Sequence, residues 1–440
     1  MRLVYLILKF VLKFGLWVFY PRLRIVNRPK NRFTRTIYAS NHAASFMDPL
    51  VIASNQSPIV FFMTRSDVFT PLIKPILWAA HMLPIYRMQD GVDTKEKNEE
   101  VFAKCNRILN FGRSLLIFSE GFTDDVFVRR LKPIKKGAVR MGFGALEHMN
   151  WKKKVYIQAL GVNYSDPNML GSEVVISNGN PICLNEYRSE YEENPSKVIG
   201  DLTKRVETEM QDQITDVRDL EWTSFHEHVM RLTKKGMSAV DSDKRIPLLE
   251  RWEYSRTLAK WMNERDLNEK VDLVELKASL ENYFTRLDKR NLKEVDLTDL
   301  ERDAFHPIKD ILFFILSFPL FALGVLHHYL PYIWVKSFVE KSFKRPVFWG
   351  SVKMLLGLLV IGIYNIILIA AINIFVYPAF WFWFMYFFIS PTLSGVVAYH
   401  YVRRLKRYTR LQGLRNEDLS SFYEERQRCQ AAIRQLIPVA

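Results

Sequence analysis

The chain has 440 residues and a formal net charge of +15, with 62 lysines and arginines against 47 aspartates and glutamates. A basic balance fits partners such as nucleic acid, anionic lipid or an anionic substrate, and the long apolar segments near the carboxyl terminus favour lipid. The sequence has no zinc-finger spacing and no basic region with heptads, which argues against a nucleic-acid-binding protein. Cys105, Cys183 and Cys429 are widely spaced and odd in number, so neither a disulfide framework nor a cysteine metal site is expected.

Residues 1–29 predict an amphipathic helix in the membrane interface. Arg2, Lys9 and Lys13 lie on one side of a helical wheel, and leucine, valine, isoleucine, phenylalanine and tryptophan cover the other sides. Pro21 ends the helical pattern. A short transmembrane anchor is the alternative, but two lysines in mid-segment make a crossing costly. The segment is therefore expected to lie in the interface, with its cations at lipid head groups.

Residues 30–185 have the mixed composition of a soluble domain, in which apolar runs alternate with helical patterns. The expected buried strands are residues 60–62, 115–118 and 155–162, and the expected helices are residues 94–111 and 139–148. This alternation predicts an α/β domain with a mixed, mainly parallel sheet flanked by helices. Residues 186–305 are highly charged with helical spacing, and they are expected to form a helical extension whose function is open.

Residues 306–402 predict a membrane domain with three apolar stretches. The stretches are residues 311–335, 354–376 and 380–402. The second and third each have the length of about 20 residues that crosses a bilayer. The first contains Pro319 and Pro331, and it is expected to form a re-entrant or interfacial hairpin.

The basic segments around the membrane stretches predict the topology. Residues 336–353 and the tail, residues 403–440, are both rich in lysine and arginine. Positive loops stay in the cytoplasm. A hairpin followed by two crossings keeps every basic segment on that side, together with the preceding domain. The sequence thus predicts an integral membrane protein, embedded in the phospholipid bilayer, with residues 30–185 on the cytoplasmic face.

The first candidate site lies between Ser40 and Leu50, where His42 and Asp48 follow an apolar run. A carboxylate can hold an imidazole in one tautomer and stabilise its protonated form, while the imidazole takes a proton from an attacking hydroxyl. The alternative is a structural role, because an aspartate before Pro49 also suits the start of a helix.

The second candidate site combines cations with a glutamate. Arg87 follows the apolar residues 82–86, and its guanidinium could bind a phosphate. Arg65, upstream, could add charge at the same site. For a single arginine, an ordinary surface position is the alternative. Glu120 and Gly121 follow a buried strand, where Glu120 could accept hydrogen bonds from glycerol hydroxyls or from Arg87.

A basic cluster follows at residues 132–138. Its Lys135 and Lys136 could hold the phosphates of an acceptor or of an acyl donor. The alternative is the ordinary basic start of a helix.

Taken in order, these segments resemble the glycerolipid acyltransferase family, which includes lysophosphatidate and glycerol-3-phosphate acyltransferases. The matching positions are Asn41, His42, Asp48, Arg87, Phe118, Glu120, Gly121 and the strand from Val155. The resemblance covers about residues 35–170. It implies an acyltransferase-type fold, with His42 as general base and Asp48 as its orienting partner. It also implies that Arg87 and Glu120 contact the glycerol phosphate and that Gly121 shapes the turn.

The sequence departs from the family pattern at several positions. Five residues separate His42 from Asp48, one more than usual; this spacing resembles a branch with glycerol-3-phosphate or dihydroxyacetone-phosphate acceptors. Ser119 replaces a proline, the last block lacks its proline, and residues 122–124 replace a Thr-Arg pair, so one phosphate arginine is missing. The candidates to replace that arginine are Arg129, Arg130 and Lys132.

The resemblance implies a membrane-bound O-acyltransferase of phospholipid synthesis. It would move a fatty acyl group from acyl-CoA or acyl carrier protein to the hydroxyl of lysophosphatidate or glycerol 3-phosphate, with no cofactor beyond the donor and no metal. One alternative is a lysophospholipid-remodelling acyltransferase. Another is a non-catalytic membrane scaffold, against which the intact His42, Asp48 and Glu120 argue.

Overall fold

The computed structural model describes residues 2–28, 35–55, 60–71, 73–86, 94–301, 306–415 and 417–439. These residues fall into two units. The sheet unit consists of Met1–Thr223 and Pro247–Glu264, and the helical unit consists of Ser224–Ile246 and Arg265–Ala440.

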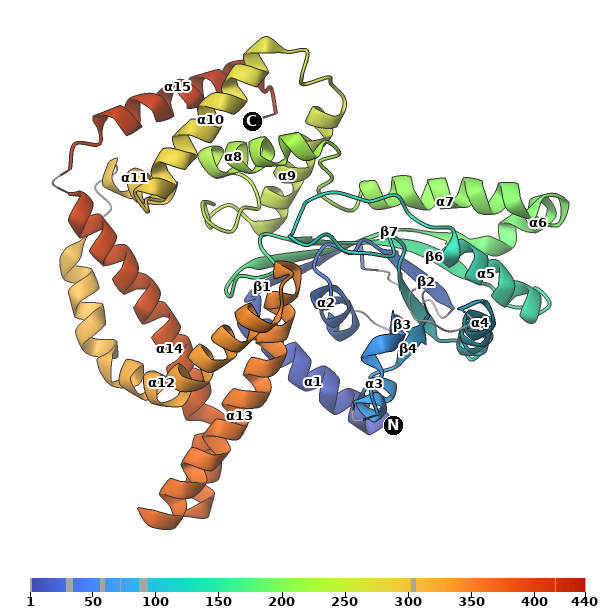
Figure 1. The fold of residues 1–440 in the computed structure, drawn as a ribbon, viewed down its shortest axis with the longest axis horizontal. Helices are drawn as coiled ribbons and strands as arrows, with labels where there is room; N and C mark the ends of the chain where they lie inside the picture. The colour runs from blue at the N-terminus through green and yellow to red at the C-terminus, as the bar shows by residue number, and fades with distance from the viewer. Residues whose placement is uncertain are drawn as a thin grey trace. The chain divides into compact units, whose positions relative to one another are not determined.

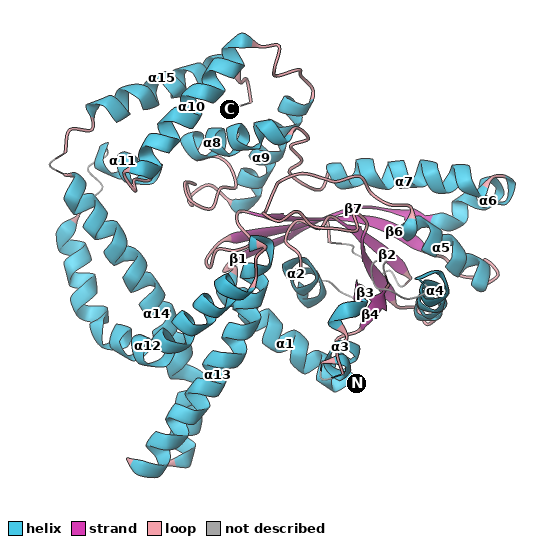
Figure 2. Ribbon diagram, viewed as in Figure 1, coloured by secondary structure: helices cyan, strands magenta, loops and turns pink. Residues whose placement is uncertain are grey.

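The sheet unit is built on a seven-stranded sheet in the order β1-β7-β6-β2-β5-β3-β4, drawn in magenta in Figure 2. Its strands are β1 (Arg22–Val26), β2 (Thr36–Ser40), β3 (Val60–Arg65), β4 (Met82–Ile85), β5 (Ser114–Phe118), β6 (Tyr156–Tyr164) and β7 (Glu173–Cys183). Neighbouring strands are parallel except for β6 and β7. This confirms the predicted mixed, mainly parallel sheet. Strands β3, β5 and β6 correspond to the three expected strands.

Helices cover both faces of the sheet. They are α1 (Arg2–Phe19), α2 (Met47–Asn55), α3 (Lys74–Ala79), α4 (Thr94–Asn110), α5 (Gly137–His148), α6 (Arg188–Glu193), α7 (Pro195–Gln211) and α9 (Leu248–Asn263). Figure 1 shows α7 on one side of the sheet and α1 and α2 on the other. The predicted helices 94–111 and 139–148 correspond to α4 and α5. Buried side chains such as Val101, Phe143 and Leu202 join α4, α5 and α7 to the core.

Helix α1 presents one face to the sheet unit and leaves another exposed. Its buried Leu16 and Tyr5 face inward, and the ring of Tyr5 stacks on His81 at 4.4 Å. The exposed large apolar side chains are Leu6, Ile7, Phe10, Val11, Phe14, Trp17 and Val18, and Lys13 is exposed as well. Among the described residues, α1 is not one of the helices long and apolar enough to cross a membrane. Its interfacial position stays a prediction.

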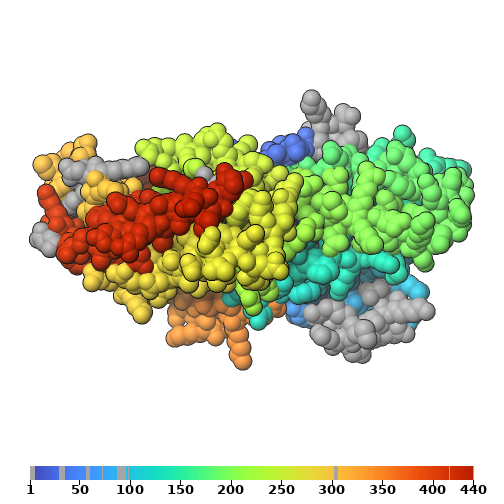
Figure 3. All heavy atoms as spheres, turned by 90° about the horizontal axis from the view of Figure 1, so that it is seen from above, coloured from blue at the N-terminus to red at the C-terminus, as the bar shows by residue number. Residues whose placement is uncertain are grey.

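The helical extension predicted for residues 186–305 is divided between the two units. Helix α7 packs on the sheet through Val198 and Leu202, because its apolar face completes the core. The helical unit contains α8 (Thr223–Thr233), α10 (Val271–Lys289), α11 (Glu294–Glu301) and α15 (Ser420–Leu436). Helices α10 and α15 lie side by side, yellow and red in Figure 3. The boundary expected at residue 185 is therefore not a break between units.

Three further helices of the helical unit are long and apolar enough to cross a membrane. They are α12 (Pro307–Ser342), α13 (Trp349–Phe375) and α14 (Phe380–Leu414). Their long apolar composition matches the three stretches expected from the sequence. Beyond the apolar part, Arg410 of α14 pairs with Asp296 of α11 at 2.9 Å, so α14 is held to the soluble helices by charge.

The first half of α12 runs along the second half of α14. At the start of α12, Asp310 forms an ion pair with Arg404. Eleven residues later, Phe321 stacks on Tyr401 with ring centroids 4.0 Å apart. Later residues of α12 therefore meet earlier residues of α14, and the two helices are antiparallel.

At the middle of α12 the direction changes. His327 forms hydrogen bonds with Asn365 of α13 and with Tyr386 of α14. From there the second half of α12 runs along α13 toward the first turns of α13, where Lys353 pairs with Glu340 of α12 at 2.7 Å. Figure 1 shows the bend. Both ends of α12 thus lie beside the basic ends of the other two helices.

The reversal expected in residues 311–335 is made by a bent continuous helix. Pro319 and Pro331 each remove a backbone donor, which bends a helix. The helix persists because neighbouring helices pack closely around it. At Gly324 a side chain would lie 2.4 Å from the carbonyl oxygen of Ser394.

Candidate active site

The site lies where parallel strands end together. His42 follows β2, Glu120 follows β5, and Tyr164 ends β6. The register aligns Ser40 of β2 with Phe118 of β5 and with Leu160 of β6. In open α/β sheets, ligands bind at the carboxyl ends of the strands. His42 and Glu120, both singled out in the sequence, are therefore at the edge where a ligand is expected.

His42 and Asp48 form a hydrogen-bonded pair, the dyad, with 2.9 Å between Nδ1 and Oδ2. Asp48 lies in the first turn of α2 and is fully buried. Asp48 therefore both starts a helix and bonds the imidazole. Since a carboxylate only accepts, Nδ1 donates, and Nε2 carries the lone pair of the neutral ring.

The turn between His42 and Asp48 accommodates the additional residue that separates them. Ser45 has φ +49°, a left-handed conformation that few residues other than glycine adopt. The amide of Ala44 also donates to Asp48 Oδ2 at 2.9 Å. Asn41 fixes the start of the turn, because its side chain bonds both the amide and the carbonyl of Val162. The turn is thus held at both ends.

The imidazole of His42 is accessible while its partner is not. Its side chain is 20% exposed, against 0% for Asp48. The ring stacks on Phe118 with centroids 4.2 Å apart. An accessible base with a buried orienting carboxylate can take a proton from a bound hydroxyl.

Glu120 is buried and paired with Lys132, and its expected contact with Arg87 lies outside the described residues. The distance from Lys132 Nζ to Glu120 Oε2 is 2.8 Å, and both side chains are almost fully buried. The same ammonium lies 3.4 Å from Asp124 and 3.5 Å from the His42 carbonyl. Burial raises the pKa of Glu120, and the charge of Lys132 opposes that rise. Lys132 thus joins the turns after β2 and β5.

Gly121 makes the turn that follows the glutamate. Its φ of +79° lies in the left-handed region. A side chain there would lie 2.8 Å from Lys135 Nζ, so Lys135 extends over the glycine, close to Glu120. The amide of Lys135 donates to Ser119 at 2.8 Å. Lys136 is exposed and immediately precedes α5.

The other predicted cations are placed as follows. Arg87 lies outside the described residues. Arg65 ends β3, is exposed, and pairs with Asp67. Arg129 donates to the carbonyl of Ser165, and Arg130 pairs with Asp124. The candidates to replace the missing arginine therefore all have protein partners.

Tyr164 is a member of the site that the sequence analysis did not name. Its hydroxyl donates to Asp48 Oδ1 at 2.8 Å. Burial and the charge of Asp48 raise the pKa of this phenol well above its ordinary value. The sequence feature that could have identified Tyr164 is its position just after the predicted strand at residues 155–162.

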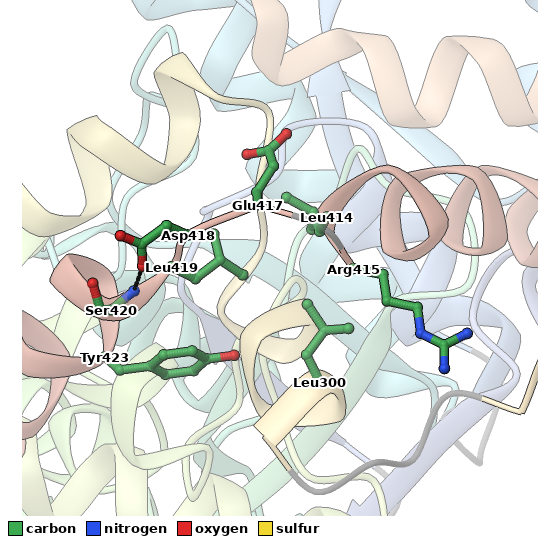
Figure 4. Close-up of a pocket in the computed structure, with 8 residues that line it drawn as sticks. All are labelled: Leu300, Leu414, Arg415, Glu417, Asp418, Leu419, Ser420 and Tyr423. Atoms are coloured by element: carbon green, nitrogen blue, oxygen red, sulfur yellow. Dashed lines mark hydrogen bonds between the residues drawn. The ribbon is translucent and has the colours of Figure 1, made fainter.

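A cavity of about 440 Å³ lies elsewhere, in the helical unit between α11, α14 and α15 (Figure 4). Its lining consists of Leu300, Leu414, Arg415, Glu417, Asp418, Leu419, Ser420 and Tyr423. None of these belongs to the dyad or its neighbours. In the described part of the chain, no three histidine, cysteine or acidic side chains are grouped to hold a metal ion.

Comparison with known families finds a match for residues 23–162, to the family described as Acyltransferase. The matched segment begins in β1 and ends in β6, so it includes the dyad, Glu120 and Lys132. It confirms the resemblance drawn from the sequence motifs. No curated protein matches the chain in sequence.

Replacement of Lys132 by methionine should destabilise the protein through Glu120. A buried charge without its partner costs about 3 kcal/mol or more of unfolding free energy. The pKa of Glu120 in the folded state is already raised, so folded protein binds this proton more readily than unfolded protein, and the cost grows as pH rises. The loss of apparent Tm should therefore be larger at about pH 8 than at about pH 5.

Lys136→Met is the matched control, because Lys136 is exposed and should change stability by less than about 0.5 kcal/mol. Equal melting of Lys132→Met and wild type at both pH values would show that the buried pair is absent.

Proposed function

Because residues 23–162 form a glycerolipid acyltransferase domain, we propose that this protein is a membrane-bound O-acyltransferase of phospholipid synthesis. It transfers a fatty acyl group from acyl-CoA or acyl carrier protein to the hydroxyl of glycerol 3-phosphate or lysophosphatidate. One observation carries the proposal: within the matched domain, an accessible imidazole is bonded at 2.9 Å to a buried carboxylate at the carboxyl edge of the sheet.

The reaction needs no covalent enzyme intermediate. Nε2 of His42 accepts the proton of the acceptor hydroxyl while the hydroxyl oxygen attacks the thioester carbonyl. The tetrahedral intermediate collapses, the carbon–sulfur bond breaks, and the thiolate takes the proton from the imidazolium. Asp48 stabilises the imidazolium while it exists. General base catalysis of this kind contributes about 10²- to 10⁴-fold to the rate.

Cations around the turn after β5 support an anionic acceptor. Lys135 lies over Gly121, which directly follows Glu120, and the neighbouring Lys136 is exposed. We assign the acceptor's phosphate to these lysines, with Arg65 and Arg87 as further candidates. The spacing between His42 and Asp48 favours glycerol 3-phosphate or dihydroxyacetone phosphate, by its resemblance to that branch of the family.

A lysophospholipid-remodelling enzyme is the second candidate function. The observation in its favour is that Arg129, Arg130 and Lys132 are all engaged by protein groups. An acceptor with a larger head group needs fewer phosphate contacts from the protein. A non-catalytic scaffold is disfavoured, because its dyad would have no reason to keep an accessible imidazole.

The geometry of the membrane helices supports a cytoplasmic position for the catalytic domain. Since α12 returns to the side on which it begins, we propose that only α13 and α14 cross and that α12 is re-entrant. The exposed cations Lys336, Lys341 and Lys344 near one end of α12 then share a side with Arg403 and Lys406 of α14. Positive segments stay in the cytoplasm. The exposed apolar face of α1 would lie in the same bilayer's interface.

The activity test uses purified full-length protein in detergent with acyl-CoA or acyl carrier protein as donor. Glycerol 3-phosphate, dihydroxyacetone phosphate, lysophosphatidate and a lysophospholipid are supplied in turn. We expect product with one phosphate acceptor, and a loss of about 10³-fold in kcat for His42→Ala. Product from the lysophospholipid alone would select the remodelling enzyme.

His148→Ala is the matched control, because His148 is exposed at the end of α5 and should keep full activity. No product with any donor and acceptor, or unchanged turnover by His42→Ala, would contradict the proposal.

The topology test compares single cysteines at the two ends of α12, in a protein whose native cysteines are replaced by serine. Lys309→Cys and Ser342→Cys are both exposed positions. A re-entrant α12 predicts that an impermeant maleimide labels both from the same side of sealed vesicles. Tyr377→Cys, in the loop between α13 and α14, should be labelled from the other side. Labelling of Lys309→Cys and Ser342→Cys from opposite sides would show that α12 crosses.

A further inference from the structure

The carboxylate of Asp48 is held by three donors, two from the turn after β2 and one from the end of β6. Oδ2 accepts from His42 Nδ1 and from the Ala44 amide, and Oδ1 accepts from the Tyr164 hydroxyl at 2.8 Å. In the described part of the chain, no lysine or arginine pairs with Asp48. A buried carboxylate without a cationic partner depends on donated hydrogen bonds. Tyr164 supplies the only side-chain donor to Oδ1 found among the described residues.

Tyr164 is suited to be a permanent donor. It is almost fully buried, and its raised pKa keeps the phenol protonated across the range in which an enzyme works. A carboxylate can rotate about its last carbon–carbon bond. With Oδ1 fixed by Tyr164, that rotation is blocked, and Oδ2 stays directed at the imidazole.

The ring of Tyr20 packs near the ring of Tyr164. Tyr20 directly follows α1, is buried, and its ring centroid lies 5.8 Å from that of Tyr164. Its hydroxyl donates to the Pro167 carbonyl at 2.8 Å, and the Gly171 amide donates to the Phe19 carbonyl at 2.8 Å. The loop after β6 is therefore tied to the end of α1.

We propose that Tyr164 is a positioning residue of the His42–Asp48 dyad, and that Tyr20 holds Tyr164 in place. The proposal rests on the proposed function, because the dyad must be the general base for its orientation to matter. It also makes α1, whose outer face is apolar and exposed, part of the support of the active site.

Among the described residues, three other charged groups act on the dyad or on its supporting tyrosines. Glu120 and Lys132 face His42 from the turn after β5, and they form an ion pair with each other. Asp166 acts on Tyr20 from the loop after β6. Since none of these is changed by replacement of Tyr164, an altered response to pH reports on the dyad.

The test is Tyr164→Phe in the full-length protein, which removes the hydroxyl alone. We expect kcat to fall roughly tenfold with KM for donor and acceptor unchanged, since one hydrogen bond to the carboxylate is lost. Without that donor the dyad takes up a proton more readily, so the acid limb of the pH–rate profile should move to higher pH. Tyr20→Phe should produce a smaller change in the same direction.

Tyr191→Phe is the matched control. Tyr191 also donates to a carboxylate, Glu147, and stacks on Phe143, but it lies on α6 away from the dyad. Tyr191→Phe should have the same kcat and the same pH–rate profile as the wild type. A fall in activity of Tyr164→Phe with an unmoved acid limb, or no change at all, would overturn the proposal.

A second measurement separates this inference from the proposed function. Diethyl pyrocarbonate modifies neutral imidazole, so the pH midpoint of His42 modification, followed by peptide mass spectrometry, needs no turnover. The midpoint should move upward in Tyr164→Phe and stay in Tyr191→Phe. An unmoved midpoint overturns the role of Tyr164, whereas absence of transfer by wild type with a moved midpoint overturns only the proposed function. If Tyr164→Phe fails to fold, Tyr20→Phe carries the same comparison.

Discussion

The burial of the Asp48 carboxylate constrains the whole site. A fully buried anion must be met by donors, and here they come from the turn after β2, which includes the imidazole, and from the end of β6. These two parts meet because β2 and β6 are parallel neighbours that end at the same edge. The left-handed Ser45 then lets five intervening residues return the chain to the imidazole. The order of the strands and the conformation of the loop after β2 thus together bring the donors to the Asp48 carboxylate.

The dyad could be predicted from sequence because it is local. His42 and Asp48 lie in one short segment, and their residue types limit the chemistry. Tyr164 could not be assigned in this way, since it lies 116 residues from Asp48 and its role depends on strand order. The partner of Glu120 was also missed: Lys132 reaches it across a loop with no periodic pattern.

The same distinction between local and distant information applies to the fold. The buried runs that became β3, β5 and β6 are apolar enough to be recognised individually. β1 contains two arginines in five residues, and only its pairing with β7 makes it a strand. For α12, the prolines predicted a reversal, which the structure has. Contacts from α13 and α14, such as those to His327, decide that a bent helix makes it. Those contacts are not visible in a local pattern.

The central claim is that His42 acts as the general base for acyl transfer, and chemical rescue tests it most directly. Acyl transfer by His42→Gly would be measured with and without added imidazole, in folded protein of unchanged melting behaviour. The side chain of His42 is partly exposed, so free imidazole can enter the space that the glycine leaves. If His42 is the general base, the variant is nearly inactive alone and imidazole restores part of its turnover. Undiminished transfer without imidazole, or an inactive folded variant that imidazole leaves inactive, would contradict it.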